Sequence, residues 1–66
     1  MNNKLRELRK HKNLTQEELA QLIGISRQAI NAIEKGKFDP SLPTAFKMAK
    51  LFALPIEELF IYSDGN

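Results

Sequence analysis

Residues 15–37, TQEELAQLIGISRQAINAIEKGK, decide the fold of this chain. Thr15 and Glu18 have the spacing of a capping box, in which the hydroxyl accepts from the N–H three residues on and the carboxylate reaches back. Apolar residues at helical spacing follow, and Gly24 then ends this first helix as a C-cap glycine does. Ser26 is a good N-cap for a second helix. We therefore expect two short helices joined by a tight turn.

The spacing within this stretch restricts how the two helices meet. Ala20 lies where the second helix must cross closely, and a larger side chain there would push the helices apart. Gly24 follows four residues later and supplies a positive φ at low cost. The apolar anchors Ile30 and Ile33 come six and nine residues after the glycine. This is the pattern of a helix-turn-helix, whose second helix enters the major groove of DNA.

A charged stretch precedes the motif. Residues 4–12, KLRELRKHK, carry Leu5 and Leu8 three apart, which indicates a short amphipathic helix with one apolar stripe. Asn2 or Asn3 is expected to cap its start. The single histidine, His11, lies near the end of this helix and is interpreted as a surface residue.

The sequence after the motif predicts two more helices. Ser41 caps the first of them, and its apolar positions at spacings of three and four are Leu42, Ala45, Phe46, Ala49 and Phe52. This helix is expected to be the largest contributor to the core, with Phe46 and Phe52 both inside. Pro55 ends it and opens a short fifth helix at 56–59.

Length and composition limit the classes of protein that fit. The chain has 66 residues, enough for one domain at 1–66 with the motif at about 16–35. It has no cysteine and one histidine, so we expect no disulfide, no metal site and no cofactor. No apolar run approaches the roughly 18 residues of a membrane span, and the N-terminus has no apolar block of the signal-peptide kind. These features predict a cytoplasmic protein without membrane contact, and no small-molecule ligand is indicated.

Charge is divided unevenly along the chain. Residues 1–37 hold eight Lys or Arg and four acids, a net +4, whereas residues 38–66 hold two and four, a net −2. Such an asymmetry is typical of a protein with one side facing a polyanion. An ordinary solvated surface is the alternative, and charge alone does not decide between them.

The chain resembles the DNA-binding domains of the lambda-repressor and Cro type, often called the Xre family. The resemblance rests on residues 15–37 and extends over about 4–60, including DPSLPTAFKMAKLF and PIEELF. It implies an all-α, five-helix lambda-repressor-like fold, and many such domains act as homodimers on palindromic operators. Pro55 departs from the family, since a serine or a similar cap is common there, and this leaves the start of the fifth helix open.

The second helix of the motif supplies the residues expected to read bases. Arg27 and Gln28 stand at its N-terminal end, which leads into the major groove. Arginine can bind guanine O6 and N7 with two hydrogen bonds, and glutamine can do so at adenine N6 and N7. Asn31, one turn on, is a candidate for a base or a phosphate, and Ala32 for a thymine methyl. An ordinary polar helix surface is the alternative for all four.

Other residues are candidates for phosphate contacts, which position a domain on the duplex without reading its sequence. Gln16 begins the first helix of the motif, where free N–H groups favour an anion, and the matching glutamine of the family donates to a phosphate. The resemblance also implies that Ser26 both caps its helix and touches a phosphate. The remaining candidates are Lys35, Lys37, Lys10, Lys12 and Asn13. A solvated surface is the alternative for each.

The resemblance also implies one structural ion pair. In similar repressor domains an arginine on the first helix pairs with a glutamate late in the third, and Arg9 and Glu34 match those positions. We expect this pair to tie the recognition helix to the rest of the domain rather than to read DNA.

The segment at 55–62 is expected to mediate dimerisation. Its apolar residues cannot all pack into so small a core, and exposed apolar surface often marks a partner site. The predicted homodimer interface consists of Ile56, Leu59, Phe60, Ile61 and Tyr62. Residues 60–62 are further predicted to be extended and to pair with residues 1–3.

These features predict a sequence-specific transcriptional regulator, a repressor that binds double-stranded operator DNA as a homodimer. The alternative is an antitoxin-like protein-interaction module that also binds its own promoter. An enzyme is not expected, because the sequence lacks a nucleophile–base pair, a metal cluster and a phosphate-binding loop.

Overall fold

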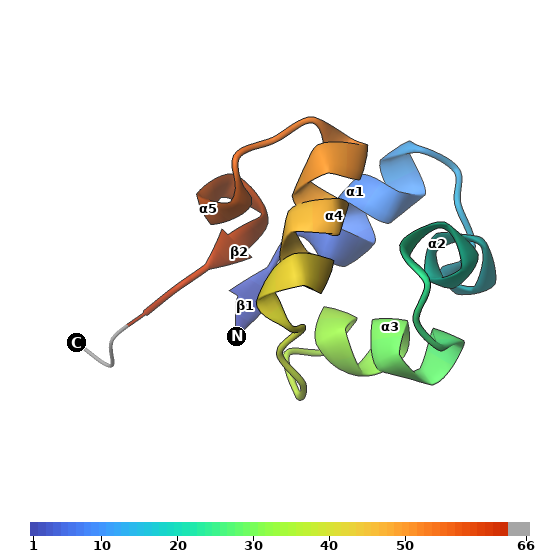
Figure 1. The fold of residues 1–66 in the computed structure, drawn as a ribbon, viewed down its shortest axis with the longest axis horizontal. Coiled ribbons are helices and arrows are strands. Elements are labelled where there is room, and N and C mark those ends of the chain that lie inside the picture. Colours follow the sequence, from blue (N-terminus) through green and yellow to red (C-terminus); the bar gives the residue numbers. More distant parts are fainter. Residues whose placement is uncertain (64–66) are drawn as a thin grey trace.

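The structure, a computed structural model, describes residues 1–63, and these form five helices and a two-stranded sheet (Figure 1). The helices are α1 (Leu5–His11), α2 (Gln16–Ile23), α3 (Arg27–Glu34), α4 (Leu42–Phe52) and α5 (Ile56–Leu59). Strands β1 (Asn2–Asn3) and β2 (Phe60–Ile61) are antiparallel, with Asn2 opposite Ile61 and Asn3 opposite Phe60. The predicted five-helix fold and its short β extension are both confirmed.

The helix boundaries follow from local chemistry. The Thr15 hydroxyl accepts from the Glu18 N–H at 3.0 Å, while the Thr15 N–H donates to Glu18 Oε1 at 2.8 Å, so the capping box is confirmed. Ser26 and Ser41 cap α3 and α4 more simply, because each side chain accepts from the N–H three residues on. Gly24 ends α2 with φ +89°, and nothing lies within 4 Å of where a Cβ would stand. Its conformation, not lack of space, therefore requires glycine.

Asn3 connects the sheet to two helices. Its Oδ1 accepts from the Leu5 N–H at 3.0 Å, which satisfies a free donor in the first turn of α1. Its Nδ2 donates to the Ile33 carbonyl at 2.8 Å, near the end of α3. The N-cap residue of α1 is Lys4, so the expectation that Asn2 or Asn3 would be the cap is wrong. Asn3 acts from one residue before the cap, and it also holds β1 against α3.

The core is made of one cluster of apolar side chains from all five helices and β2. Its members are Leu5, Leu19, Ala20, Ile23, Ile30, Ile33, Ala45, Met48, Ala49, Phe52, Leu59 and Phe60. Leu5, Leu19, Ile30, Met48 and Leu59 have no exposed surface. The shared cluster shows that α2 and α3 are fixed by the same packing that buries α4 and α5.

The prediction that Phe46 belongs to the core is wrong, and so is the inclusion of Leu42 in the apolar stripe. Phe46 is 55% exposed and Leu42 is 65% exposed, whereas Met48, outside the predicted stripe, is fully buried. The buried face of α4 runs along Ala45, Met48 and Phe52, and about 100° of rotation per residue carries Phe46 off its edge. Leu42 lies in the first turn and lines a shallow groove.

The longest helix, α4, has 11 residues. Within residues 1–63, no helix combines the length and the apolar character needed to cross a bilayer.

Candidate nucleic-acid interface

The helix α3 presents one face to the core and the opposite face outward. Ile30 and Ile33 are buried, whereas Arg27 and Gln28, at the N-terminal end, are exposed. Figure 1 shows α3 at the edge of the molecule, below α2, with its N-terminal end away from the body. Ser26 Oγ accepts from the Ala29 N–H at 3.0 Å, so the helix start is fixed where the two exposed side chains emerge.

Asn31 and Ala32 lie one turn further along α3 and are both partly buried. Both are less exposed than Arg27 and Gln28, and the Gln16 side chain at the start of α2 donates to Asn31 Oδ1 at 3.2 Å. The four residues predicted to face bases are therefore on one helix, with two fully outward and two set deeper.

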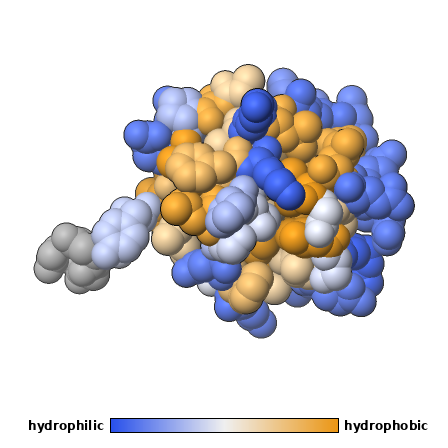
Figure 2. All heavy atoms as spheres, in the orientation of Figure 1, coloured by the Kyte–Doolittle hydropathy of each residue, from blue (hydrophilic) through white to orange (hydrophobic). Residues whose placement is uncertain are grey.

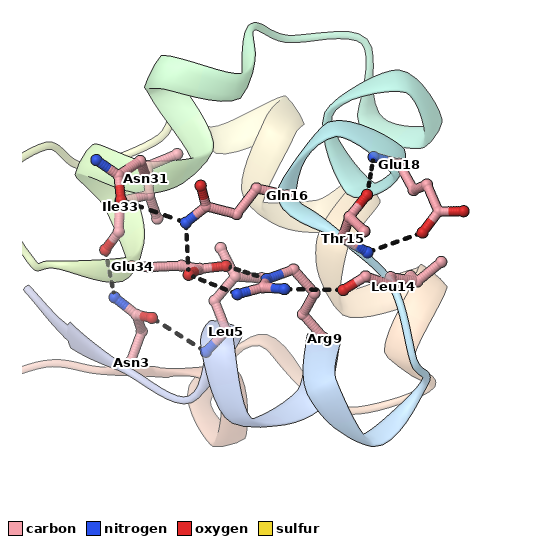
Figure 3. A network of polar contacts seen from close by, with 10 residues as sticks. All are labelled: Asn3, Leu5, Arg9, Leu14, Thr15, Gln16, Glu18, Asn31, Ile33 and Glu34. Atoms are coloured by element: carbon pink, nitrogen blue, oxygen red, sulfur yellow. Dashed lines mark hydrogen bonds and ion pairs between the residues drawn. The ribbon is translucent and has the colours of Figure 1, made fainter.

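Arg9 and Glu34 form a nearly buried ion pair between α1 and the last residue of α3 (Figure 3). Arg9 Nε lies 2.6 Å from Glu34 Oε2, and Arg9 Nη2 lies 3.2 Å from Glu34 Oε1. Arg9 Nη1 also donates to the Leu14 carbonyl at 2.8 Å. The guanidinium thus joins α3 to α1 and to the loop before α2, which is the placement that the family resemblance implies.

Gln16 is engaged inside the protein rather than turned fully outward. Its Nε2 donates to Asn31 Oδ1 at 3.2 Å and to Glu34 Oε1 at 3.1 Å (Figure 3). A glutamine amide has two N–H donors, so both are used within the domain. A phosphate approaching Gln16 would therefore meet the backbone N–H at the start of α2 unless it displaced one of these bonds.

The cationic candidates are at the ends of α1 and α3. Lys35 is the C-cap residue of α3 and Lys37 lies two residues on, and both are exposed. Lys10, Lys12 and Asn13 are exposed at the end of α1, and Asn13 has a left-handed φ of 58°.

Sequence reasoning missed Arg6. A polar hollow of about 230 Å³ lies between α1 and α3, lined by Arg6, Arg9, Gln16, Asn31, Glu34 and Lys35. Arg6 is exposed and stands three residues before Arg9, which places the two on one side of α1. The three-residue spacing from Arg9 was the signal in the sequence from which the position of Arg6 could have been predicted. The structure brings Arg6 and Lys35 to the rim of the hollow that holds the Arg9–Glu34 pair.

Two residues assigned to the dimer interface are inside the protomer. Leu59 has no exposed surface and Phe60 is 8% exposed, because both pack into the core cluster, so their assignment is wrong for the folded domain. Ile56 is partly buried, whereas Ile61 and Tyr62 are 42% and 75% exposed. Only the last two of the five are freely available to a partner.

No group of three or more His, Cys, Asp or Glu side chains in the described part of the chain is placed to share a metal ion.

Comparison with known proteins identifies the fold. The helix-turn-helix family model matches residues 5–59. An uncharacterized HTH-type transcriptional regulator of Methanocaldococcus jannaschii is 61% identical over 66 residues, which cover all of both chains. The cryptic phage CTXphi transcriptional repressor RstR of Vibrio cholerae is 43% identical over 63 residues, covering 96% of this chain and 57% of RstR.

A solved structure agrees with these relatives. The restriction-modification controller protein C.AhdI from Aeromonas hydrophila superposes with a TM-score of 0.74 and 41% identity, over 85% of each chain. The family is one of transcriptional regulators that bind DNA, and it is not an enzyme family. The matched residues, 5–59, include both α2 and α3. This chain belongs to the helix-turn-helix family of DNA-binding transcriptional regulators, of the lambda-repressor and Cro type.

Proposed function

We propose that this regulator is a repressor that binds a palindromic operator as a homodimer, with α3 in the major groove. One observation carries the proposal: Arg27 and Gln28 are exposed at the capped N-terminal end of a helix whose other end is held by the Arg9–Glu34 pair. A recognition helix has to be rigid, because a base contact requires donors and acceptors at hydrogen-bond distance.

In this proposal Arg27 and Gln28 read bases. Arg27 offers two parallel donors to guanine O6 and N7, and Gln28 offers one donor and one acceptor to adenine N7 and N6. Asn31 and Ala32 are partly buried one turn further along α3, so they contact bases only once the exposed N-terminal end of α3 is inserted in the groove.

Phosphates on either side of the groove are held by the helix ends. The backbone N–H groups at the start of α2, at Gln16, and at the start of α3, after Ser26, face outward with the positive end of the helix dipole. Lys35 and Lys37 meet the backbone beyond the C-terminal end of α3, and Lys10 and Asn13 supplement them from α1. Arg6 joins this set from the rim of the polar hollow.

The dimer is proposed to form through the C-terminal tail and the exposed end of α4. Ile61 and Tyr62 line a hollow that shares Met1 and Asp39 with the groove lined by Leu42. Phe46 is exposed one turn after Leu42 on α4. Figure 2 shows apolar side chains at the surface over α4 and toward β2. One module makes few phosphate contacts, so two are needed for a specific operator. A protein that remains monomeric by light scattering, alone and with DNA, would contradict this part.

An antitoxin-like role is the second candidate, because one apolar groove suits a different protein as well as a second copy. The groove has a volume of about 230 Å³ and its lining includes Pro40, Leu42, Ile56 and Phe60. Mass measurement on complexes isolated from the native cell would separate the two roles, since a heteromeric complex favours the antitoxin and a homodimer the repressor.

Selection of binding sites from randomised duplex DNA, repeated at two salt concentrations, tests the proposal. The expected result is a palindromic site with half-sites about one helical turn apart and an affinity that falls steeply with salt. Enrichment of no sequence would overturn it.

A further inference from the structure

We propose that Asn31 reads DNA as a hydrogen-bond donor only and thereby selects guanine over adenine, because Gln16 and Glu34 fix the direction of its amide. This inference rests on the proposed function, since it requires α3 in the major groove. It assigns a base preference to one position of the half-site and a positioning role to two residues that do not touch a base.

Hydrogen bonds connect Arg9, Glu34, Gln16 and Asn31, and Glu34 determines which atoms donate and which accept. Its carboxylate has only acceptor atoms, and Arg9 donates to both of them, at 2.6 Å to Oε2 and 3.2 Å to Oε1. The amide atom of Gln16 that lies 3.1 Å from Glu34 Oε1 must therefore be a donor, which is the nitrogen and not the oxygen. The ion pair thus determines which way the Gln16 amide faces.

The same constraint passes on to Asn31. The second N–H of Gln16 points to the Asn31 side chain at 3.2 Å, and a donor in that place requires an acceptor opposite. Asn31 accordingly turns its carbonyl oxygen toward Gln16. Figure 3 shows the Asn31 nitrogen on the side of the amide away from Gln16. Hydrogen bonds in such a chain strengthen one another, so the orientation of Asn31 is held cooperatively.

An asparagine fixed in this way differs from a free one. A free amide binds adenine with its N–H on N7 and its carbonyl on the N6 amino group. In this chain the carbonyl is turned toward Gln16, so the group that Asn31 presents on the side away from Gln16 is its NH2, which can only donate. Guanine presents two neighbouring acceptors in the major groove, N7 and O6, whereas adenine places an amino donor beside its N7. The donor-only amide therefore favours a G·C pair over an A·T pair.

Three variants in the binding-site selection test this inference. Asn31→Ala removes the proposed base contact. Gln16→Met removes the amide that donates to Asn31 but keeps a side chain of similar length. Gln21→Met makes the same change at an exposed position of α2 and serves as the control. We expect the parent to enrich a G·C pair at one position of each half-site and Asn31→Ala to lose the preference at that position alone. Gln16→Met should let the amide rotate, so that the preference for G·C over A·T there falls by about fivefold or more. Gln21→Met should match the parent.

Several results would overturn the inference while leaving DNA binding intact. One is an A·T pair, in the parent, at the position that Asn31→Ala affects. Another is a uniform loss of affinity in Asn31→Ala with no change of preference, which would indicate a phosphate contact. A third is an unchanged preference in Gln16→Met. Thermal melting confirms that each variant is folded, and Asn31→Ala, at a partly exposed position, is decisive even if Gln16→Met is not folded. If the parent enriches no sequence, the proposed function itself fails, and the inference with it.

Discussion

Glu34, the last residue of α3, forms an ion pair with Arg9 of α1 in which both side chains are nearly buried, at 10% exposure for Arg9 and 3% for Glu34. Burial of a charge is unfavourable unless a partner and hydrogen bonds compensate for it, and here three bonds from the guanidinium do so. The pair therefore holds the C-terminal end of α3 against α1.

Removal of Glu34 should destabilise the fold. Glu34→Ala leaves the Arg9 guanidinium buried without its partner, and we expect the free energy of unfolding to fall by about 3–5 kcal/mol. Urea unfolding followed by circular dichroism measures this loss. Glu7→Ala, at an exposed position of α1, serves as the control and should change stability by less than about 1 kcal/mol. Equal midpoints for the two variants would show that the pair does not stabilise the domain.

The turn between α2 and α3 should tolerate asparagine better than alanine. Gly24 has φ +89°, a left-handed conformation that costs an L-residue about 1–2 kcal/mol. Since an added Cβ meets nothing within 4 Å, the whole cost of Gly24→Ala is conformational. Gly24→Asn should therefore lose less stability, because asparagine visits this region more readily. Thermal melting of the two variants decides the point, and an asparagine variant as unstable as the alanine variant would argue against it.

The buried face of α4 can be tested by a pair of truncations. Met48→Ala should lower the free energy of unfolding by about 2–5 kcal/mol because it opens a cavity in the core. Phe46→Ala removes a larger but exposed side chain and should change it by about 0.5 kcal/mol or less. Chemical denaturation of both variants at a concentration where the protein is monomeric provides the comparison. The reverse order of stabilities would place Phe46 in the core after all.

Several features were predictable because they depend on local chemistry. The capping box at Thr15 and the left-handed glycine at position 24 are each determined by a few neighbouring residues. The errors concern positions whose environment is set by distant elements. Phe46 and Met48 are both compatible with an apolar helix, and only the packing of α4 on the rest of the core decides between them. The pairing of residues 60–62 with residues 1–3 was predicted, but the sequence does not reveal which side of the paired strands faces the core, and Phe60 is turned inward.

The candidate site was predictable to a similar extent. The exposed positions Arg27 and Gln28 follow from the periodicity of α3, so sequence alone placed them outward. The engagement of Gln16 with Asn31 and Glu34 was not predictable, because it depends on the crossing of two helices and on the direction of amide groups. The family resemblance supplied the partner of Arg9, which no local pattern indicates.

Phosphate contacts should appear in the salt dependence of DNA binding. Lys35→Ala and Lys37→Ala each remove one exposed cation beyond α3, and each should reduce the slope of log K against log salt by about 0.9. The sequence preference should remain that of the parent, since phosphate contacts do not read bases. Lys47→Ala, on α4, is the matched control and should leave the slope unchanged. Fluorescence anisotropy over a salt series gives the slopes, and identical slopes in all four proteins would contradict the assignment.

The most direct measurement is a binding-site selection with an Arg27→Ala/Gln28→Ala variant that is shown to be folded by its melting curve. If the exposed start of α3 reads the major groove, the variant should lose preference at the base pairs that these residues contact, by about 1–3 kcal/mol for each bidentate contact, and retain weak salt-dependent binding. A folded variant that selects the same duplex as strongly as the parent would contradict recognition through α3.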